Sequence, residues 1–237
     1  MVDKTFTSTR QELHRIAVHV VARARHQATG RFSLRVTPAG FGTPDFGPGG
    51  RRVRVTGGHV LVESDAPGDP RVKASALDGS SLGQLAELAE VDLTAPLDVG
   101  HDTPAIGDVD APIAVDEGAA TELGRWYGLI GEVLDRTVAA LAVAGSAATL
   151  PRLWPEHFDV AIETDARPGR RVNLGGSPGD GFSPEPYCYV GPWTADRPGD
   201  ESFWNAPFGA VLPLASPGPD GVAEAVEFLT SGVARLR

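Results

Sequence analysis

The sequence predicts an α+β fold in which a largely antiparallel β-sheet carries packed helices. Residues 8–28 and 118–144 repeat apolar side chains at helical spacing, and shorter stretches between them alternate apolar and polar residues. The pair Gly57–Gly58 stands between two such alternating stretches and predicts a β-hairpin. Hydrophobic residues make up 41% of the chain and charged residues 22%, which is typical of a globular protein.

We expect a single α+β domain over residues 1–237, because the chain is long enough to bury a sizeable core. The pattern also contains two similar halves. Residues 1–90 are predicted as helix, strands and short helix, and residues 116–237 as long helix, strands and helix. An acidic, proline-rich crossing over residues 91–115 joins these halves. They share no residue-by-residue repeat, so their similarity rests on the order of elements alone.

The first predicted helix, residues 8–28, has an apolar face and a basic face. Its apolar face consists of Leu13, Ile16, Ala17, Val20 and Ala24. The opposite face consists of Arg15, His19, Arg23 and His26, and we expect solvent to cover it. His19 and His26 lie two turns apart, about 10 Å along the axis, so one metal ion cannot bridge them.

The rest of the first half is predicted from short patterns. Strands are expected at 31–36 and 71–76, a long Gly/Pro loop at 38–50 and a short helix at 81–89. On one face, the hairpin register pairs Val55 with Val60 and Val53 with Val62. The same register sets Arg52 opposite Glu63, which is a favourable cross-strand ion pair.

The second half begins with the long helix at 118–144 and ends with a helix from about Pro219. Strands are expected between them at 158–164, 171–174, 186–191 and 208–212. The glycine-rich run from Gly175 to Gly179 is expected to form a tight turn.

Charge is distributed unevenly along the chain, whose net charge is −10. Residues 1–60 carry ten Arg and Lys against three Asp and Glu, whereas residues 61–150 carry four against sixteen. We expect the basic first segment to face the acidic middle of its own chain. No nucleic-acid partner is expected, because an acidic protein repels a polyanion.

The sequence also bears on location. It has no apolar run of transmembrane length, and its start lacks the apolar core of a signal peptide. Its one cysteine cannot form an internal disulfide, so we expect a cytoplasmic protein without membrane contact. No cofactor is implied, and nothing predicts the oligomeric state.

The best polar cluster is formed by Glu156, His157 and Asp159. In a strand that begins at about His157, residues 157 and 159 share a face, and such a pair can ligate a metal or act as acid and base. Two ligands are too few for a metal site, so none is predicted. The favoured interpretation is that His157 braces the entry to the strand. Asp98, His101 and Asp102 in the acidic crossing are a weaker metal candidate.

Aromatic and polar residues around this cluster are candidates for a ligand pocket. They are Trp154, Asp180, Glu185, Trp193, Trp204 and Asn205. The alternative is that they occupy ordinary core positions. This alternative is favoured for the tryptophans, whose indole N–H groups would then be hydrogen-bonded inside the core.

Two residues of nucleophilic type are expected to be inert. Ser177 lies in a G-x-S-x-G run, but Pro178 lacks the backbone N–H that an oxyanion hole needs after the serine. No histidine follows His157 in the chain, so the third member of a hydrolase triad is missing as well. Cys188 alternates away from Tyr187 and Tyr189 on a predicted strand and is expected to be buried.

Three runs of the second half carry a resemblance to a known family. They are L-W-P-E-H-F-D from Leu153, E-P-Y-C-Y-V-G-P-W from Glu185 and F-W-N-A-P-F from Phe203. With them the chain resembles a family of uncharacterised, mainly actinobacterial proteins, catalogued as a domain of unknown function. The resemblance implies a bacterial α+β protein and carries over no catalytic residue.

Three functions remain open from the sequence. The favoured one is a non-catalytic protein that binds a small molecule or a partner. The second is a metal-assisted or acid–base enzyme centred on His157 and Asp159, with Glu156 as a further catalytic candidate. The third is a purely structural or interaction module.

Overall fold

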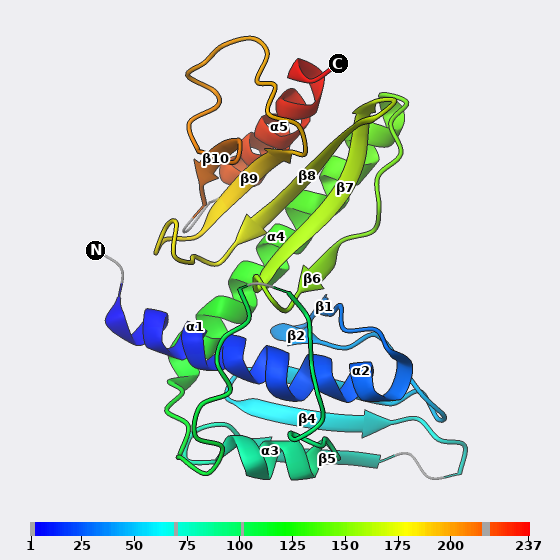
Figure 1. Ribbon diagram of the computed structural model, residues 1–237, viewed down its shortest axis with the longest axis vertical. Coiled ribbons are helices and arrows are strands. Elements are labelled where there is room, and N and C mark those ends of the chain that lie inside the picture. Colours follow the sequence, from blue (N-terminus) through cyan, green and yellow to red (C-terminus); the bar gives the residue numbers. More distant parts are fainter. Residues whose placement is uncertain (1–2, 69–70, 101, 215–218) are drawn as a thin grey trace. The chain divides into compact units, whose positions relative to one another are not determined.

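The computed structural model describes residues 3–68, 71–100, 102–214 and 219–237 (Figure 1). It contains two five-stranded antiparallel sheets with packed helices, which confirms the predicted α+β class. The chain forms two compact units. Unit 1 comprises residues 1–128 and 153–158, and unit 2 comprises residues 129–152 and 159–237. Their boundary falls inside the long helix and not in the crossing at 91–115, and the single domain stays a prediction.

Unit 1 contains a sheet with strand order β1-β2-β3-β4-β5. The strands are β1 (Arg35–Thr37), β2 (Gly40–Gly42), β3 (Arg52–Thr56), β4 (His59–Ser64) and β5 (Arg71–Ala76). The predicted hairpin and its register are confirmed, and Val53, Val55, Val60 and Val62 are all buried. The expected strand at 31–36 is wrong in its bounds, since β1 begins only at Arg35.

Strand β2 lies inside the stretch predicted as a loop. A Cβ at Gly40 would lie 2.0 Å from the Val55 carbonyl oxygen, so only glycine allows the strands to approach this closely. Gly42 is equally crowded, with the Arg54 Cβ 2.5 Å from its own Cβ position. Because two of its three residues are glycine, β2 has no alternating pattern that sequence reasoning can detect.

The helices of unit 1 are α1 (Lys4–Ile16), the π-helix η1 (Ala17–Ala22), α2 (Arg23–Thr29) and α3 (Leu82–Leu88). The first three are continuous and lie across one face of the β1–β5 sheet (Figure 1). The predicted apolar face is confirmed as buried, and Gly30 ends the helix with a left-handed φ of 72°.

The expected solvated basic face of this helix is wrong, because His19 and Arg23 are buried. The His19 Nε2 donates to the Pro104 carbonyl oxygen over 2.8 Å, and an Arg23 Nη1 donates to that of Ala95 over 2.6 Å. The acidic crossing therefore meets the basic face, as expected. Main-chain carbonyl groups, rather than carboxylates, accept these hydrogen bonds.

His14 in α1 is held in the same way. Its Nε2 donates to the Pro155 carbonyl oxygen over 2.8 Å, and its ring stacks on Phe158 with 5.0 Å between centroids. Burial away from water lowers the pKa of His14 to about 4, so the ring is neutral at pH 7.

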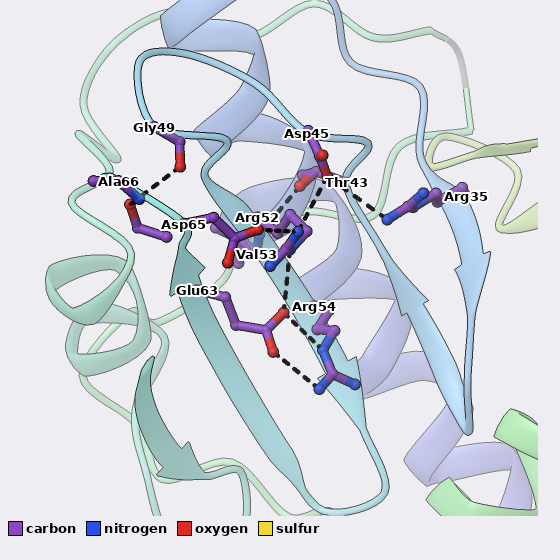
Figure 2. Close-up of polar contacts among 11 residues, drawn as sticks. Arg35, Thr43, Asp45, Gly49, Arg52, Val53, Arg54, Glu63, Asp65 and Ala66 are labelled. Atoms are coloured by element: carbon purple, nitrogen blue, oxygen red, sulfur yellow. Dashed lines mark hydrogen bonds and ion pairs between the residues drawn. The ribbon is translucent and has the colours of Figure 1, made fainter. Parts of the chain in front are cut away.

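The other face of the β1–β5 sheet carries ion pairs (Figure 2). Glu63 accepts from Arg54 at both carboxylate oxygens, over 3.0 and 3.1 Å, and has Arg52 at 3.5 Å. The predicted pairing of Arg52 with Glu63 is confirmed in register. The shortest ion pair of Arg52, however, is with Asp65 at 2.7 Å.

The second sheet has strand order β10-β9-β8-β7-β6. Its strands are β6 (Arg152–Trp154), β7 (Asp159–Arg167), β8 (Arg170–Ser177), β9 (Tyr187–Pro192) and β10 (Ala210–Pro213). The flanking helices are α4 (Glu117–Val143) and α5 (Pro219–Arg235). Within unit 2 both helices pack on one face of the sheet (Figure 1). On this face Ile130 of α4 lies against Gly176, and Gly232 of α5 lies against Val190.

Among the described residues, no helix has the length and apolar character that crossing a bilayer requires.

Candidate functional site

The glycine-rich run after Leu174 is not the tight turn that the sequence predicts. Gly175, Gly176 and Ser177 extend β8 and pair with β9. A Cβ at Gly175 would lie 2.6 Å from the Tyr189 hydroxyl oxygen, and one at Gly176 would lie 2.6 Å from the Ile130 Cδ1. The glycines therefore admit a tyrosine ring on one face of the sheet and a helix on the other.

Two tyrosines of β9 stand on the face opposite the helices, and each donates its hydroxyl to a carboxylate. Tyr189 donates to an Asp159 carboxylate oxygen. Tyr187 donates to the Asp180 Oδ2 over 2.6 Å. Burial, reinforced by the adjacent carboxylates, raises the pKa of both phenols well above the usual value. Both side chains are therefore neutral hydrogen-bond donors at pH 7.

Two phenylalanines complete a four-ring cluster with these tyrosines. Phe182 packs edge-on against Tyr187 at 5.7 Å and against Phe208 at 5.1 Å between centroids. Phe208 also packs edge-on against Tyr189 at 6.4 Å. Phe182 is 47% exposed and Phe208 is 37% exposed, although both are apolar. We name these four residues, Phe182, Tyr187, Tyr189 and Phe208, the aromatic platform.

Asp180 fixes the loop that carries Phe182. Its Oδ1 accepts from the backbone N–H groups of Phe182 and Ser183, over 2.8 and 3.1 Å. Its Oδ2 accepts from Tyr187 and from the Ser177 hydroxyl at 3.0 Å. Of the candidates drawn from the sequence, Asp180 and Asp159 thus both belong to the support of the platform.

Trp193 lies just beyond β9 and extends its pairing, since its N–H donates to the Arg171 carbonyl oxygen. Its indole N–H donates to the Asn173 Oδ1 over 2.8 Å, and the Arg171 guanidinium lies 4.5 Å from the ring centroid. The side chain is 59% exposed, so Trp193 is not the core residue that the sequence favours.

The remaining ligand candidates each have a different partner. Trp154 packs near Phe32 at 6.2 Å, and the Trp204 indole donates to the Pro198 carbonyl oxygen over 3.0 Å. Asn205 exchanges two hydrogen bonds with the Val211 backbone and so braces β10. Glu185 is exposed in the loop between β8 and β9.

His157 lies in a turn and not in a strand, so the prediction that it shares a strand face with Asp159 is wrong. The chain turns before β7 at Phe158, the residue after His157, which has a left-handed φ of 59°. This conformation is rare for a bulky residue, and buried contacts hold it: the Tyr127 hydroxyl donates to the Phe158 carbonyl oxygen over 2.8 Å.

The neighbours of His157 belong to unit 1. Its Nδ1 lies 2.9 Å from the Asp102 Oδ2, in a pair that is half exposed or more. Glu156 is buried, with its side chain against Gly100. His101 of the weaker metal candidate lies outside the described residues. Among the described residues, no group of three or more His, Cys, Asp and Glu side chains is arranged to hold a metal ion.

The two residues of nucleophilic type are engaged or buried. The Ser177 hydroxyl donates to Asp180 and accepts from the Gly179 N–H over 3.2 Å. Cys188 is fully buried, as predicted, and burial raises the pKa of its thiol.

Sequence reasoning missed a surface pocket of about 280 Å³ in unit 1, which Arg51, Lys73 and Glu90 help to line. One signal was present: Glu90 directly follows the short helix, where a left-handed residue, usually glycine, is favoured. Its φ is 52°.

Comparison of this chain with known proteins found no matching family model, no similar curated protein and no similar solved structure. The actinobacterial family stays a prediction.

Proposed function

We propose that this chain is a non-catalytic binding protein and that the aromatic platform of unit 2 takes its ligand. One observation carries the proposal: two half-exposed phenylalanines stand edge-on against two tyrosines that are locked by carboxylates. Exposed aromatic side chains that cost little conformational entropy on binding are typical of ligand and partner surfaces.

The rigidity of the platform supports binding. Tyr187 and Tyr189 cannot rotate without losing a charge-assisted hydrogen bond, and Asp180 also fixes the backbone at Phe182. A surface that is already ordered loses less freedom when a ligand settles on it.

The charge of unit 2 favours a neutral or cationic ring over an anionic one. Residues 129–152 and 159–237 carry eight Arg and Lys against thirteen Asp and Glu. Asp180 and Glu185 are exposed beside the platform. A ligand that combines an aromatic or apolar body with an ammonium group fits both the rings and this charge.

The side chains of the site support binding rather than chemistry. A tyrosine whose pKa is raised is a poor proton acceptor at pH 7, and the Cys188 thiol is neither exposed nor ionised. A single buried thiol also fits a cytoplasmic location, which is part of this proposal.

The test is a titration with benzylamine, whose ammonium form carries a ring and a positive charge, followed by NMR of the aromatic side chains. Saturable shifts of the Phe182 and Phe208 signals are expected, and benzoate, the anion of similar size, should bind more weakly. Phe182→Ala should abolish the shifts. Leu150→Ala, which removes another exposed apolar side chain of unit 2, should leave them unchanged. Absence of saturable shifts in the wild type would leave a structural module as the better account.

A second candidate function, an acid–base enzyme at His157, rests on its contact with Asp102. A carboxylate that orients one imidazole nitrogen leaves the other nitrogen free to exchange a proton with a substrate. His157→Gln should abolish any hydrolase or isomerase activity found in a substrate screen. Activity that survives this substitution excludes the candidate.

A further inference from the structure

A pocket in unit 1 is separate from the residues of the aromatic platform. It has a volume of about 280 Å³ and lies beside the ends of β4 and β5. Pro48, Val62 and Ala66 supply apolar lining. This volume is near the lower end of small-molecule sites, about 300 Å³, and so suits a compact ligand.

Three cationic side chains line the pocket: Arg51, Arg71 and Lys73. Arg51 is held in place from two sides, because its Nη2 donates to the Ala89 carbonyl oxygen over 2.5 Å and its guanidinium lies 5.7 Å from the Phe46 ring centroid. Its side chain is only 24% exposed. A guanidinium fixed in this way is ready to receive an anion without reorganising.

The pocket has two carboxylates, and they differ in their engagement. Glu63 directs both carboxylate oxygens to Arg54 on the outer sheet face (Figure 2). Glu90 instead reaches the pocket cations, with one oxygen 3.2 Å from the Lys73 Nζ and the other 3.5 Å from the Arg51 Nη1. The Glu90 side chain is 62% exposed, so it can move away into solvent.

The backbone at Glu90 is in an unfavourable conformation for glutamate. Its N–H donates to the Glu87 carbonyl oxygen, and the Val91 N–H donates to that of Ala86. These bonds form the Schellman motif that ends α3, in which glycine is preferred at the left-handed position. The chain places there a side chain whose carboxylate bridges two cations of a pocket.

We infer that this pocket is a binding site for a small carboxylate or phosphate anion, and that the Glu90 carboxylate occupies the anion position until the ligand displaces it. Arg51 and Lys73 hold the Glu90 carboxylate and the anionic group of the ligand in turn, while the apolar lining contacts the body of the ligand. The exchange conserves charge pairing at both cations, so the site is closed to cations and open to anions.

The experiment is a titration of the whole chain with inorganic phosphate at constant ionic strength, followed through the side-chain NMR signals of Arg51 and Lys73. The wild type should show weak saturable binding. Glu90→Gln should bind phosphate about tenfold more tightly, since one charge-assisted competitor is removed. Glu90→Gly, which also suits the left-handed backbone, should do the same and guards against a folding defect in the first variant.

Glu132→Gln is the matched control, because Glu132 is 50% exposed, pairs with Arg136 at 2.6 Å and changes the net charge equally. It should leave the phosphate affinity unchanged, and Arg51→Gln should abolish binding. Succinate in place of phosphate distinguishes a carboxylate ligand from a phosphate ligand by the tighter of the two affinities. No saturable binding of either anion to the Glu90 variants, or equal tightening by Glu132→Gln, overturns the inference.

Discussion

Units 1 and 2 build the same kind of sheet but use its outer face differently. Unit 1 contains β1–β5 and unit 2 contains β7–β10, in each case antiparallel, in sequential order and with helices packed on one face. Unit 1 carries partly exposed ion pairs such as Arg52 with Asp65 on its outer face, whereas unit 2 carries aromatic rings tied to Asp159 and Asp180. Ion pairs that solvent reaches are screened and stabilise little, whereas the hydrogen bond from Tyr189 to the buried Asp159 is costly to break. One scaffold therefore supports a solvated surface and a rigid one.

The interiors differ as well. All six histidines of the sequence fall in unit 1, and the single cysteine falls in unit 2. Unit 1 uses the basic side chains of its first helix to hold the carbonyl groups of the acidic crossing. Loss of these basic side chains should therefore destabilise unit 1 and leave the aromatic platform of unit 2 in place.

The largest effect is expected from Arg23→Ala. Arg23 is buried and donates to the carbonyl oxygens of Asp92, Leu93 and Ala95. Its removal takes this donor from all three oxygens, and among the described residues only that of Asp92 keeps a second donor, the Gln27 side-chain amide. We expect the free energy of unfolding to fall by roughly 3 kcal/mol. Urea unfolding measures this loss, and hydrogen exchange should rise at residues 92–95. Arg31→Ala, at an exposed position, should change neither quantity.

Acidification should destabilise unit 1 selectively. Burial lowers the folded-state pKa of His14 from 6.5 to about 4 and also lowers that of His19. The unfolded chain therefore binds more protons between these values, and stability present above pH 6.5 is lost as the pH falls toward 4. For His14 the loss is at most about 3 kcal/mol.

Hydrogen exchange at pH 7 and pH 5 measures this difference between the units. Peptides of unit 1 should lose protection at pH 5 before those of unit 2. In His14→Gln the pH dependence should be smaller, whereas His59→Gln, at the exposed end of the hairpin, should behave as the wild type does. Equal loss of protection in both units would contradict the claim that the buried histidines of unit 1 cause the acid sensitivity.

Removal of the two platform hydroxyls should give unequal effects. Tyr189→Phe deprives the buried Asp159 of its tyrosine donor and should cost about 2 kcal/mol. Tyr187→Phe should cost about 1 kcal/mol, because Asp180 keeps Ser177 and two backbone donors. Thermal unfolding of both variants checks the order, and a reversed order would show that Asp159 does not depend on Tyr189.

The smallest effect is expected on the outer face of unit 1. Glu63→Gln removes the carboxylate shared by Arg52 and Arg54 and should cost about 1 kcal/mol or less. The loss should shrink in 0.5 M NaCl, since salt screens partly exposed charges. A larger loss that is insensitive to salt would mean that the two outer faces are equally rigid.

The sequence predicted those elements whose cause is local. The Gly57–Gly58 hairpin was found with its register, because turn and alternation lie within twelve residues. Strand β2 and the extension of β8 were missed. Their glycines are required by the close approach of Val55, Tyr189 and Ile130, which belong to other elements. The turn at His157 depends on buried contacts of Phe158, and no pattern in the sequence records them.

Only part of the candidate site was predicted, because its contacts also join residues that are far apart in the sequence. Asp159, Asp180 and Trp193 were singled out by residue type, but their partners were not predictable. The basic face of the first helix was misjudged because the Pro104 carbonyl that His19 meets is 85 residues away in the chain. Carbonyl acceptors are present at every residue and so leave no signal in the sequence.

The most direct measurement is one NMR titration in which benzylamine and inorganic phosphate are added in turn to the same sample. Two separate sets of shifts are expected. Benzylamine should move signals of Phe182, Phe208 and Tyr189 in unit 2, and phosphate should move signals of Arg51 and Lys73 in unit 1. Saturable shifts from benzylamine anywhere other than the platform, or none at all, would contradict the claim that the rigid aromatic face is the ligand-binding surface.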